Sequence, residues 1–210
     1  MLIKNTMESR YLYRSIYVFS LVLILSSCSN SYTPREYKIW IESSENGFSK
    51  TKVLEELEYG VQFQTPEYKL LQKLGPVDFF KITDVESELL SYDFDYSFLF
   101  KITNLNGIPP LRYKLTDDKE YYGRIQYFNS AIQKDFFLIV EKKDTLPCLF
   151  AHLERDFGIS PELRLQLSFG DVVEDKNVQL CYIDKLYNNG MVKFTLNWKD
   201  LKELPKLIKG

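Results

Sequence analysis

The stretch YDFDYSFLF, from Tyr92 to Phe100, decides the fold because every second residue in it is aromatic. Side chains two residues apart lie on the same face of an extended strand. One face is therefore wholly aromatic, whereas the opposite face carries Asp93, Asp95, Ser97 and Leu99. This alternation predicts a β-strand with one buried face.

Other segments of the chain repeat the strand signal. Alternation recurs at 163–169 and 192–198, and Phe136 to Val140 is apolar throughout, as in a strand covered on both faces. Shorter strands are expected at Tyr37 to Ile41 and Tyr59 to Gln64. These segments predict a fold built mainly of strands.

Two turn sequences join neighbouring strands. Asn188-Asn189-Gly190 supplies residues that accept positive φ, so 178–198 is expected to form a β-hairpin. Lys142-Lys143-Asp144 is expected to turn the 136–140 strand into a strand from Thr145 to Glu154. Both connections favour antiparallel pairing.

Helix signals are fewer than strand signals. Thr65-Pro66-Glu67 is typical of a helix start, and we expect that helix to end near Gly75. Asp117 opens a longer helix, whose apolar residues recur at helical spacing at Tyr121, Ile125, Phe128 and Ile132. The predicted class is α+β, mainly antiparallel β in a sheet or sandwich, with one or two packed helices.

Composition excludes several classes of protein. The 210 residues include 45% hydrophobic and 15% aromatic residues, which excludes a disordered tail. The 27 Lys and Arg residues nearly balance the 29 Asp and Glu residues, so the chain has no summed positive field to attract nucleic acid. The sequence therefore predicts a globular protein without a nucleic-acid partner.

The N-terminus has the layout of a secretory signal. Basic residues lie within 4–14, and the uncharged run Ile16 to Leu25 follows, too short for the about 20 apolar residues of a transmembrane helix. Leu25-Ser26-Ser27-Cys28 resembles the lipobox of bacterial lipoproteins. This resemblance implies cleavage before Cys28 and acylation of that residue.

The lipobox divides the chain into three parts. We expect a signal peptide at 1–27, an acylated Cys and polar leader at 28–36, and a single β-rich domain at 37–210. Two or more acyl chains hold a protein durably on a membrane.

The residues after Cys28 indicate which membrane carries the protein. Among lipoproteins, Asp directly after the Cys resembles an inner-membrane retention signal, and an acidic run there resembles a surface-export signal. Ser29 to Pro34 contains no acid, which favours the periplasmic face of the outer membrane.

Cys148 and Cys181 remain once Cys28 is assigned to lipid. An even pair of cysteines in an exported protein fits a disulfide. Both residues also lie among Leu, Phe and Tyr, as buried thiols do. The residues leave both interpretations open.

Catalytic and metal-binding patterns are weak. The single His, His152, lies four residues from Cys148, about 13 Å along a strand, so the two cannot ligate one metal together. Asp93 and Asp95 form a carboxylate pair that lacks the Gly and distal Glu of a calcium loop. We therefore expect no catalytic residue, no metal site and no cofactor.

Three segments resemble a family of uncharacterised Bacteroidetes lipoproteins: 40–74, 143–159 and 199–207 (KDLKELPKL). The resemblance brings no activity or site residues. Asp144-Thr145-Leu146 is similar to the short O-glycosylation sequon of exported Bacteroidetes proteins, which would place a glycan on Thr145. A hairpin turn explains the same three residues.

The function expected from these features is that of a lipid-anchored envelope module that binds or scaffolds other components without catalysis. Its partners would be the membrane, through the acyl chains on Cys28, and an envelope protein or glycan. The alternative is an envelope enzyme or glycan-binding protein that uses surface carboxylates and aromatic residues.

Overall fold

The computed structural model describes residues 31–82, 84–90, 96–154, 160–170, 176–197, 199 and 204–208. Contacts divide the chain into two units, Met1–Ser31 and Tyr32–Gly210. Within the second unit, antiparallel sheets predominate and helices accompany them, so the α+β prediction is confirmed.

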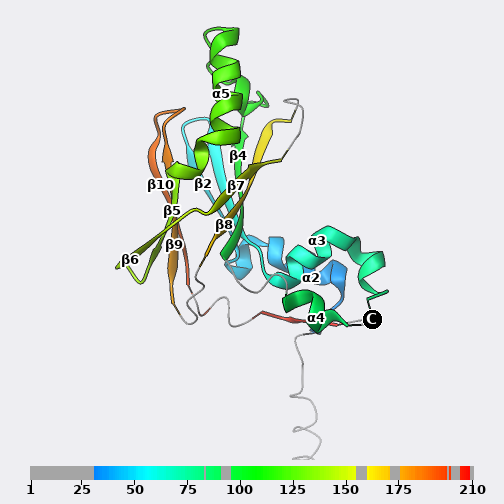
Figure 1. The fold of residues 1–210 in the computed structure, drawn as a ribbon. Coiled ribbons are helices and arrows are strands. Elements are labelled where there is room, and N and C mark those ends of the chain that lie inside the picture. The colour runs from blue at the N-terminus through cyan, green and yellow to red at the C-terminus, as the bar shows by residue number, and fades with distance from the viewer. Residues whose placement is uncertain are drawn as a thin grey trace, which may run out of the picture. The chain divides into compact units, whose positions relative to one another are not determined.

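Two antiparallel sheets form the body of this unit (Figure 1). The five-stranded sheet has the order β2-β3-β4-β8-β7 and the four-stranded sheet the order β10-β9-β5-β6. The strands of the first sheet, in chain order, are β2 (Ser49–Leu54), β3 (Leu57–Phe63), β4 (Tyr96–Asn104), β7 (Phe150–Leu153) and β8 (Glu162–Phe169). Those of the second are β5 (Phe136–Val140), β6 (Asp144–Pro147), β9 (Val178–Asp184) and β10 (Gly190–Leu196).

The two sheets share one apolar core, which makes them a sandwich. The ring of Phe100 on β4 lies 4.9 Å from that of Phe136 on β5 and 5.1 Å from that of Tyr182 on β9. We call this cluster the sandwich core. Its largest members with almost no exposure are Tyr59, Tyr96, Phe98, Phe100, Phe128, Phe136, Phe169 and Tyr182.

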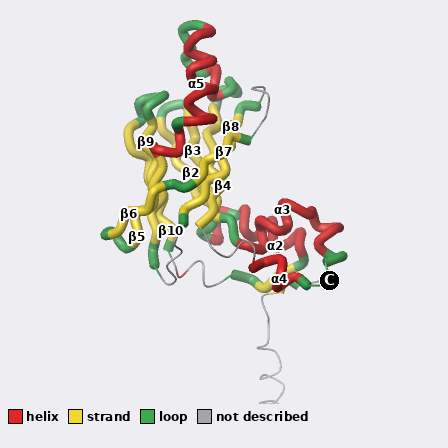
Figure 2. The backbone as a smooth tube through the Cα atoms, viewed as in Figure 1, coloured by secondary structure: helices red, strands yellow, loops and turns green. Residues whose placement is uncertain are grey.

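Helices occupy two places in the unit (Figure 2). Helix α5 (Asp118–Ser130) lies at one end of the sheets, and α2 (Pro34–Glu42), α3 (Pro66–Phe79) and α4 (Val85–Leu90) gather beside the other. Short 3₁₀ turns are η1 (Ser44–Asn46), η2 (Pro110–Arg112) and η3 (Ile132–Asp135), and β1 (Ser31–Tyr32) pairs with β11 (Lys206–Leu207).

A second apolar cluster, the helical core, lies among α2, α3 and their neighbours. Its buried members are Tyr37, Ile41, Phe48, Tyr68, Leu70, Leu71 and Phe79. Among the described residues, no helix is both long enough and apolar enough to cross a bilayer.

Several predicted elements are confirmed. The 178–198 hairpin is present, with Gly190 opposite Asp184, and the strand at 136–140 has the expected bounds. Thr65 and Asp117 cap α3 and α5 as expected.

Two other predictions are met in part. Gly75 has φ of 71° and interrupts α3, which continues beyond it to Phe79. Of the 92–100 segment, residues 92–95 lie outside the described residues, and the rest begins β4 with the expected aromatic face buried.

The expected strand at Tyr37 to Ile41 is wrong, because these residues belong to α2. Thr33 and Glu36 form a reciprocal capping box and Pro34 occupies the first turn, so the helix start lies inside the segment expected to be a leader. The five alternating residues from Tyr37 to Ile41 fit either a strand or a helix. The capping box upstream of them decides in favour of a helix.

The expected single strand from Thr145 to Glu154 is also wrong. It consists of β6 and β7, which belong to different sheets. Pro147 ends β6 opposite Phe137, and a proline cannot donate a hydrogen bond to a continuing ladder. The segment therefore leaves one sheet and enters the other.

Candidate functional site

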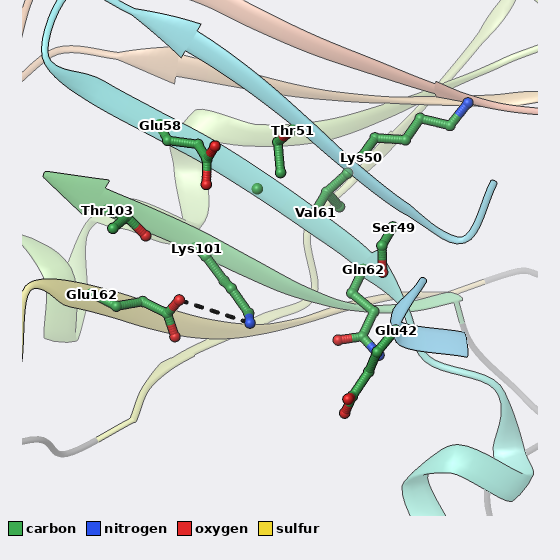
Figure 3. A pocket seen from close by; sticks show the side chains of 11 residues that line it. Glu42, Ser49, Lys50, Thr51, Glu58, Val61, Gln62, Lys101, Thr103 and Glu162 are labelled. Carbon is green, nitrogen blue, oxygen red and sulfur yellow. Dashed lines mark ion pairs between the residues drawn. The ribbon is translucent and has the colours of Figure 1, made fainter. Parts of the chain in front are cut away.

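A polar groove lies on the outer face of the five-stranded sheet (Figure 3). Its cavity volume is about 230 Å³. Strands β2, β3, β4 and β8 line it together with Glu42 at the end of α2. The lining side chains are mainly hydroxyl, amide and charged groups, and none is aromatic.

Strand register brings these groups together from distant parts of the chain. Glu58 lies opposite Thr103, which lies opposite Glu162 on the next strand. In the adjacent row, Gly60 lies opposite Lys101. Antiparallel neighbours in such rows have Cβ atoms about 5 Å apart, so side chains on the outer face lie within reach of one another.

Gly60 leaves the floor of the groove open. A Cβ added at this position would meet Lys101 Cβ at 3.6 Å and Thr51 Cγ2 at 3.8 Å, which is ordinary van der Waals contact. A Cβ alone would therefore fit between Lys101 and Thr51 without displacing them. A glycine inside a strand often marks a place where a ligand approaches the backbone.

An ion-pair network borders the groove. Lys101 Nζ lies 3.8 Å from Glu162 Oε2, and in Figure 3 the two side chains point toward each other. Arg164 Nε lies 3.1 Å from Glu162 Oε1, and Arg164 Nη1 lies 3.4 Å from Glu154 Oε2. Lys50 extends away from the Lys101–Glu162 pair. The network holds the ammonium of Lys101 beside a carboxylate that a second cation already contacts.

Carboxylates outnumber cations inside the groove. Glu58 faces it beside Thr103 without an ion-pair partner among the residues described. Glu42 Oε1 accepts a hydrogen bond of 2.7 Å from the Tyr68 hydroxyl. Burial, reinforced by this carboxylate, raises the pKa of Tyr68 to about 12, so the hydroxyl remains a donor. A cationic ligand group therefore fits the groove better than an anionic one.

Gln62 closes one end of the groove. Gln62 is only 5% exposed, and its amide nitrogen has no hydrogen-bond partner among the described residues. Leu99, fully buried beside it in the same strand row, shows that this end of the outer face is covered rather than solvated. The groove is therefore covered at this end.

The predicted cysteines are separate in the structure. Both Cys148 and Cys181 are free and buried, which agrees with the thiol alternative and not with a bridge. Cys148 Sγ donates to the carbonyl oxygen of Phe150 at 3.0 Å, and Cys181 Sγ lies 3.8 Å from that of Gln179. Cys148 Sγ also lies 3.6 Å from the carbonyl oxygen of Ser168 on β8.

Thr145 is exposed on the edge strand β6. It lines a second, largely apolar cavity of about 430 Å³ with Phe136, Phe137, Pro147 and Cys148. The exposure leaves the hydroxyl accessible, and the β5–β6 turn accounts for the neighbouring residues.

His152 lies on β7 beside an aromatic ring. Its ring stacks on Phe150 with centroids 6.0 Å apart, and no cluster of three metal-ligating side chains occurs in the described part of the chain. Cys28, Asp93 and Asp95 lie outside the described residues.

The sequence patterns did not single out the groove residues. Gly60 within the 59–64 strand was the available signal, because an isolated glycine in a strand pattern suggests a close approach. Lys101 and Glu162 are 61 positions apart in the sequence and meet only through the β4–β8 register.

No protein-family model and no curated protein matches the chain. One similar solved structure is a protein of unknown function from Burkholderia pseudomallei K96243, with 14% identity and a TM-score of 0.39, covering 81% of this chain and 88% of that one. Another is a DUF4426 family protein from Pseudomonas aeruginosa PAO1, with 6% identity and a TM-score of 0.33, covering 71% of this chain and 91% of that one. Likenesses this distant carry no argument about function.

Proposed function

We propose that this protein is a lipid-anchored lipoprotein of the cell envelope whose sandwich binds a cationic, polar segment of another envelope protein. Leu25 to Cys28 supplies the acylation site, and the groove over Gly60 supplies the binding site. The observation that carries the binding role is this groove, in which Glu58 faces an open floor beside hydroxyl groups.

The groove's chemistry selects among the partners. A Lys or Arg side chain can pair with Glu58, while main-chain amides of the same segment can meet Thr51 and Thr103. Sugar rings usually pack against exposed aromatic faces, and the groove has no aromatic lining. A peptide segment therefore fits better than a glycan.

The anchor is tested in the full chain. Cys28→Ala should move the protein from the membrane fraction to the soluble fraction, because the acyl chains provide the durable attachment. Mass analysis of the N-terminal peptide should find diacylglycerol and an N-acyl chain on Cys28 of the unaltered protein. An unmodified, uncleaved N-terminus would contradict the anchor.

The groove is tested by cross-linking in cells. A photoreactive residue at Thr103 should form adducts with an envelope protein, and Gly60→Val should abolish them by filling the floor. Glu58→Gln should weaken them about fivefold, the loss of roughly 1 kcal/mol expected for an exposed ion pair.

A matched control uses the other sheet. Thr195→Val introduces the same residue as the groove variant at an exposed position of β10, and it should leave the Thr103 adducts unchanged. A photoreactive residue at Thr195 supplies the background level. Adducts at Thr103 that equal this background, or that persist in both groove variants, would identify the groove as a solvated sheet face.

A further inference from the structure

The folded unit begins very close to the acylation site. Tyr32 lies four positions after Cys28, and even a fully extended chain of four steps reaches at most about 14 Å. Folded structure follows at once, because Thr33 caps α2 and Pro34 opens it. The polar leader expected at 28–36 is therefore too short to hold the unit away from the lipid.

The residues next to this tether form one local surface. The N–H of Ile208 donates to the carbonyl oxygen of Tyr32 at 3.0 Å, so the end of β11 lies beside β1. Ile208 is 40% exposed, and Lys206 and Arg35 are exposed as well. We call Tyr32, Arg35, Lys206 and Ile208 the tether surface.

The chemistry of the tether surface suits the interface of an anionic bilayer. The exposed aliphatic side chain of Ile208 can enter the headgroup region, whereas the Tyr32 ring packs against the helical core at the border of this surface. Each Lys or Arg close to an anionic lipid surface strengthens association about fivefold. Glu36, the acid of the same helical turn, remains a carboxylate that accepts from the backbone N–H and hydroxyl of Thr33, so Arg35 and Lys206 exceed it by one charge.

We propose that the tether surface rests directly on the lipid bilayer, so that the anchored protein is seated at the membrane rather than suspended from it. This inference rests on the proposed acylation of Cys28. A short tether confines the unit to the bilayer, and the basic and apolar side chains decide which part of it faces the lipid.

The test uses the full acylated chain in vesicles of phosphatidylethanolamine and phosphatidylglycerol. An environment-sensitive fluorophore is attached to Ile208→Cys or, as a second position, to Lys206→Cys. Cys148 and Cys181 are buried, and burial raises the pKa of both thiols, so they react slowly with the label. Quenching by a lipid-borne quencher then reports contact with the bilayer.

Met191→Cys provides the matched control, because Met191 is 46% exposed but lies on β10. Labels at 208 and 206 should be quenched strongly, and the label at 191 should not.

Inserting a flexible linker of about 20 residues after Asn30, which spans roughly 25 Å, should reduce quenching at 208. In that lengthened chain, Arg35→Gln and Lys206→Gln should each weaken the remaining contact about fivefold.

Flotation with the vesicles separates the two proposals. Protein that fails to float has no anchor, which overturns the proposed lipoprotein function itself. Protein that floats but shows equal quenching at 208 and 191 has an anchor and is not seated through the tether surface. Strong quenching at 208 and 206, without quenching at 191, supports the inference.

Discussion

Asp184 is the residue on which the β9–β10 turn depends. It is 3% exposed, and its carboxylate accepts from the Tyr59 hydroxyl at 2.7 Å and from backbone N–H groups of Leu186, Tyr187 and Asn189. Burial, together with this carboxylate, raises the pKa of Tyr59, so its hydroxyl stays a donor. The residue thus links the hairpin turn to the central part of the other sheet.

Asp184→Asn should lower the free energy of unfolding by about 1 to 3 kcal/mol, because an amide NH₂ group would face a donor within a buried site. Urea denaturation measures the change. Asp144→Asn on exposed β6 is the control and should stay within about 0.5 kcal/mol of the unaltered protein. Equal effects of the two substitutions would contradict this account of the turn.

The two buried cysteines give a second prediction at this scale. Denatured but unreduced protein that is acylated at Cys28 should contain two titratable thiols, because Cys148 and Cys181 are free in the structure. In the native state both should react slowly, since burial raises the pKa of Cys148 to about 11 and raises that of Cys181 as well. Ellman's reagent measures both states.

Single Ser substitutions serve as controls for the thiol count. Cys148→Ser and Cys181→Ser should each remove one titratable thiol from the denatured protein. A denatured, unreduced protein without titratable thiols would instead demonstrate the disulfide.

At the scale of elements, the start of α5 carries a pH dependence. Glu120 accepts from the backbone N–H of Thr116 at 2.9 Å, from Arg124 at 2.6 Å and from the Thr116 hydroxyl at 2.9 Å. These donors lower the pKa of Glu120 from 4.5 to about 2. The folded state therefore favours the carboxylate, and this contribution is present above pH 4.5 and is lost as the pH falls toward 2.

Glu120→Gln should remove this contribution at every pH. The variant should be less stable than the unaltered protein at pH 7, because Arg124 is 4% exposed and would lose its carboxylate partner. The difference between the two proteins should shrink as the pH is lowered from 4.5 to 2. Thermal unfolding followed by circular dichroism measures both profiles, and parallel profiles would contradict the role of Glu120.

Sequence patterns predicted those elements whose signals are local. Alternation identified β8 and β10, and capping residues identified α3 and α5, since each pattern lies within one element. The assignment of Tyr37 to Ile41 was wrong because five residues fit two periodicities and the deciding signal, the Thr33 capping box, lay upstream. The division between β6 and β7 depends on which sheet each strand joins, which local patterns do not encode.

At the scale of the whole molecule, the groove could not be predicted from the sequence. Glu58, Lys101 and Glu162 belong to three strands, and only the register of β3, β4 and β8 brings them together. Register is set by the burial of the opposite face, where Tyr59, Phe100 and their neighbours pack. The polar site is therefore a consequence of how the core is arranged.

The two cores of the Tyr32–Gly210 unit share one side chain, Phe63. Its ring lies 6.3 Å from that of Phe48 in the helical core and 5.5 Å from that of Phe98 in the sandwich core. The chain also passes from β3 into α3 through only two residues, and the N–H of Gln64 donates to the carbonyl oxygen of Ser97 at 2.8 Å. This shared packing predicts that both cores unfold in one cooperative transition.

Phe63→Ala should lower the free energy of unfolding by about 2 kcal/mol, less than for a fully buried ring, and should separate the transitions of the two cores. Trp40, whose ring lies 5.2 Å from that of Phe48, reports the helical core by fluorescence once Trp198 is replaced by Phe. Far-UV circular dichroism near the strand minimum reports the sheets. Phe150→Ala, at a ring that is 55% exposed, is the control and should keep a single transition. If the unaltered protein already shows two transitions, or if Phe63→Ala keeps them coincident, Phe63 does not couple the cores.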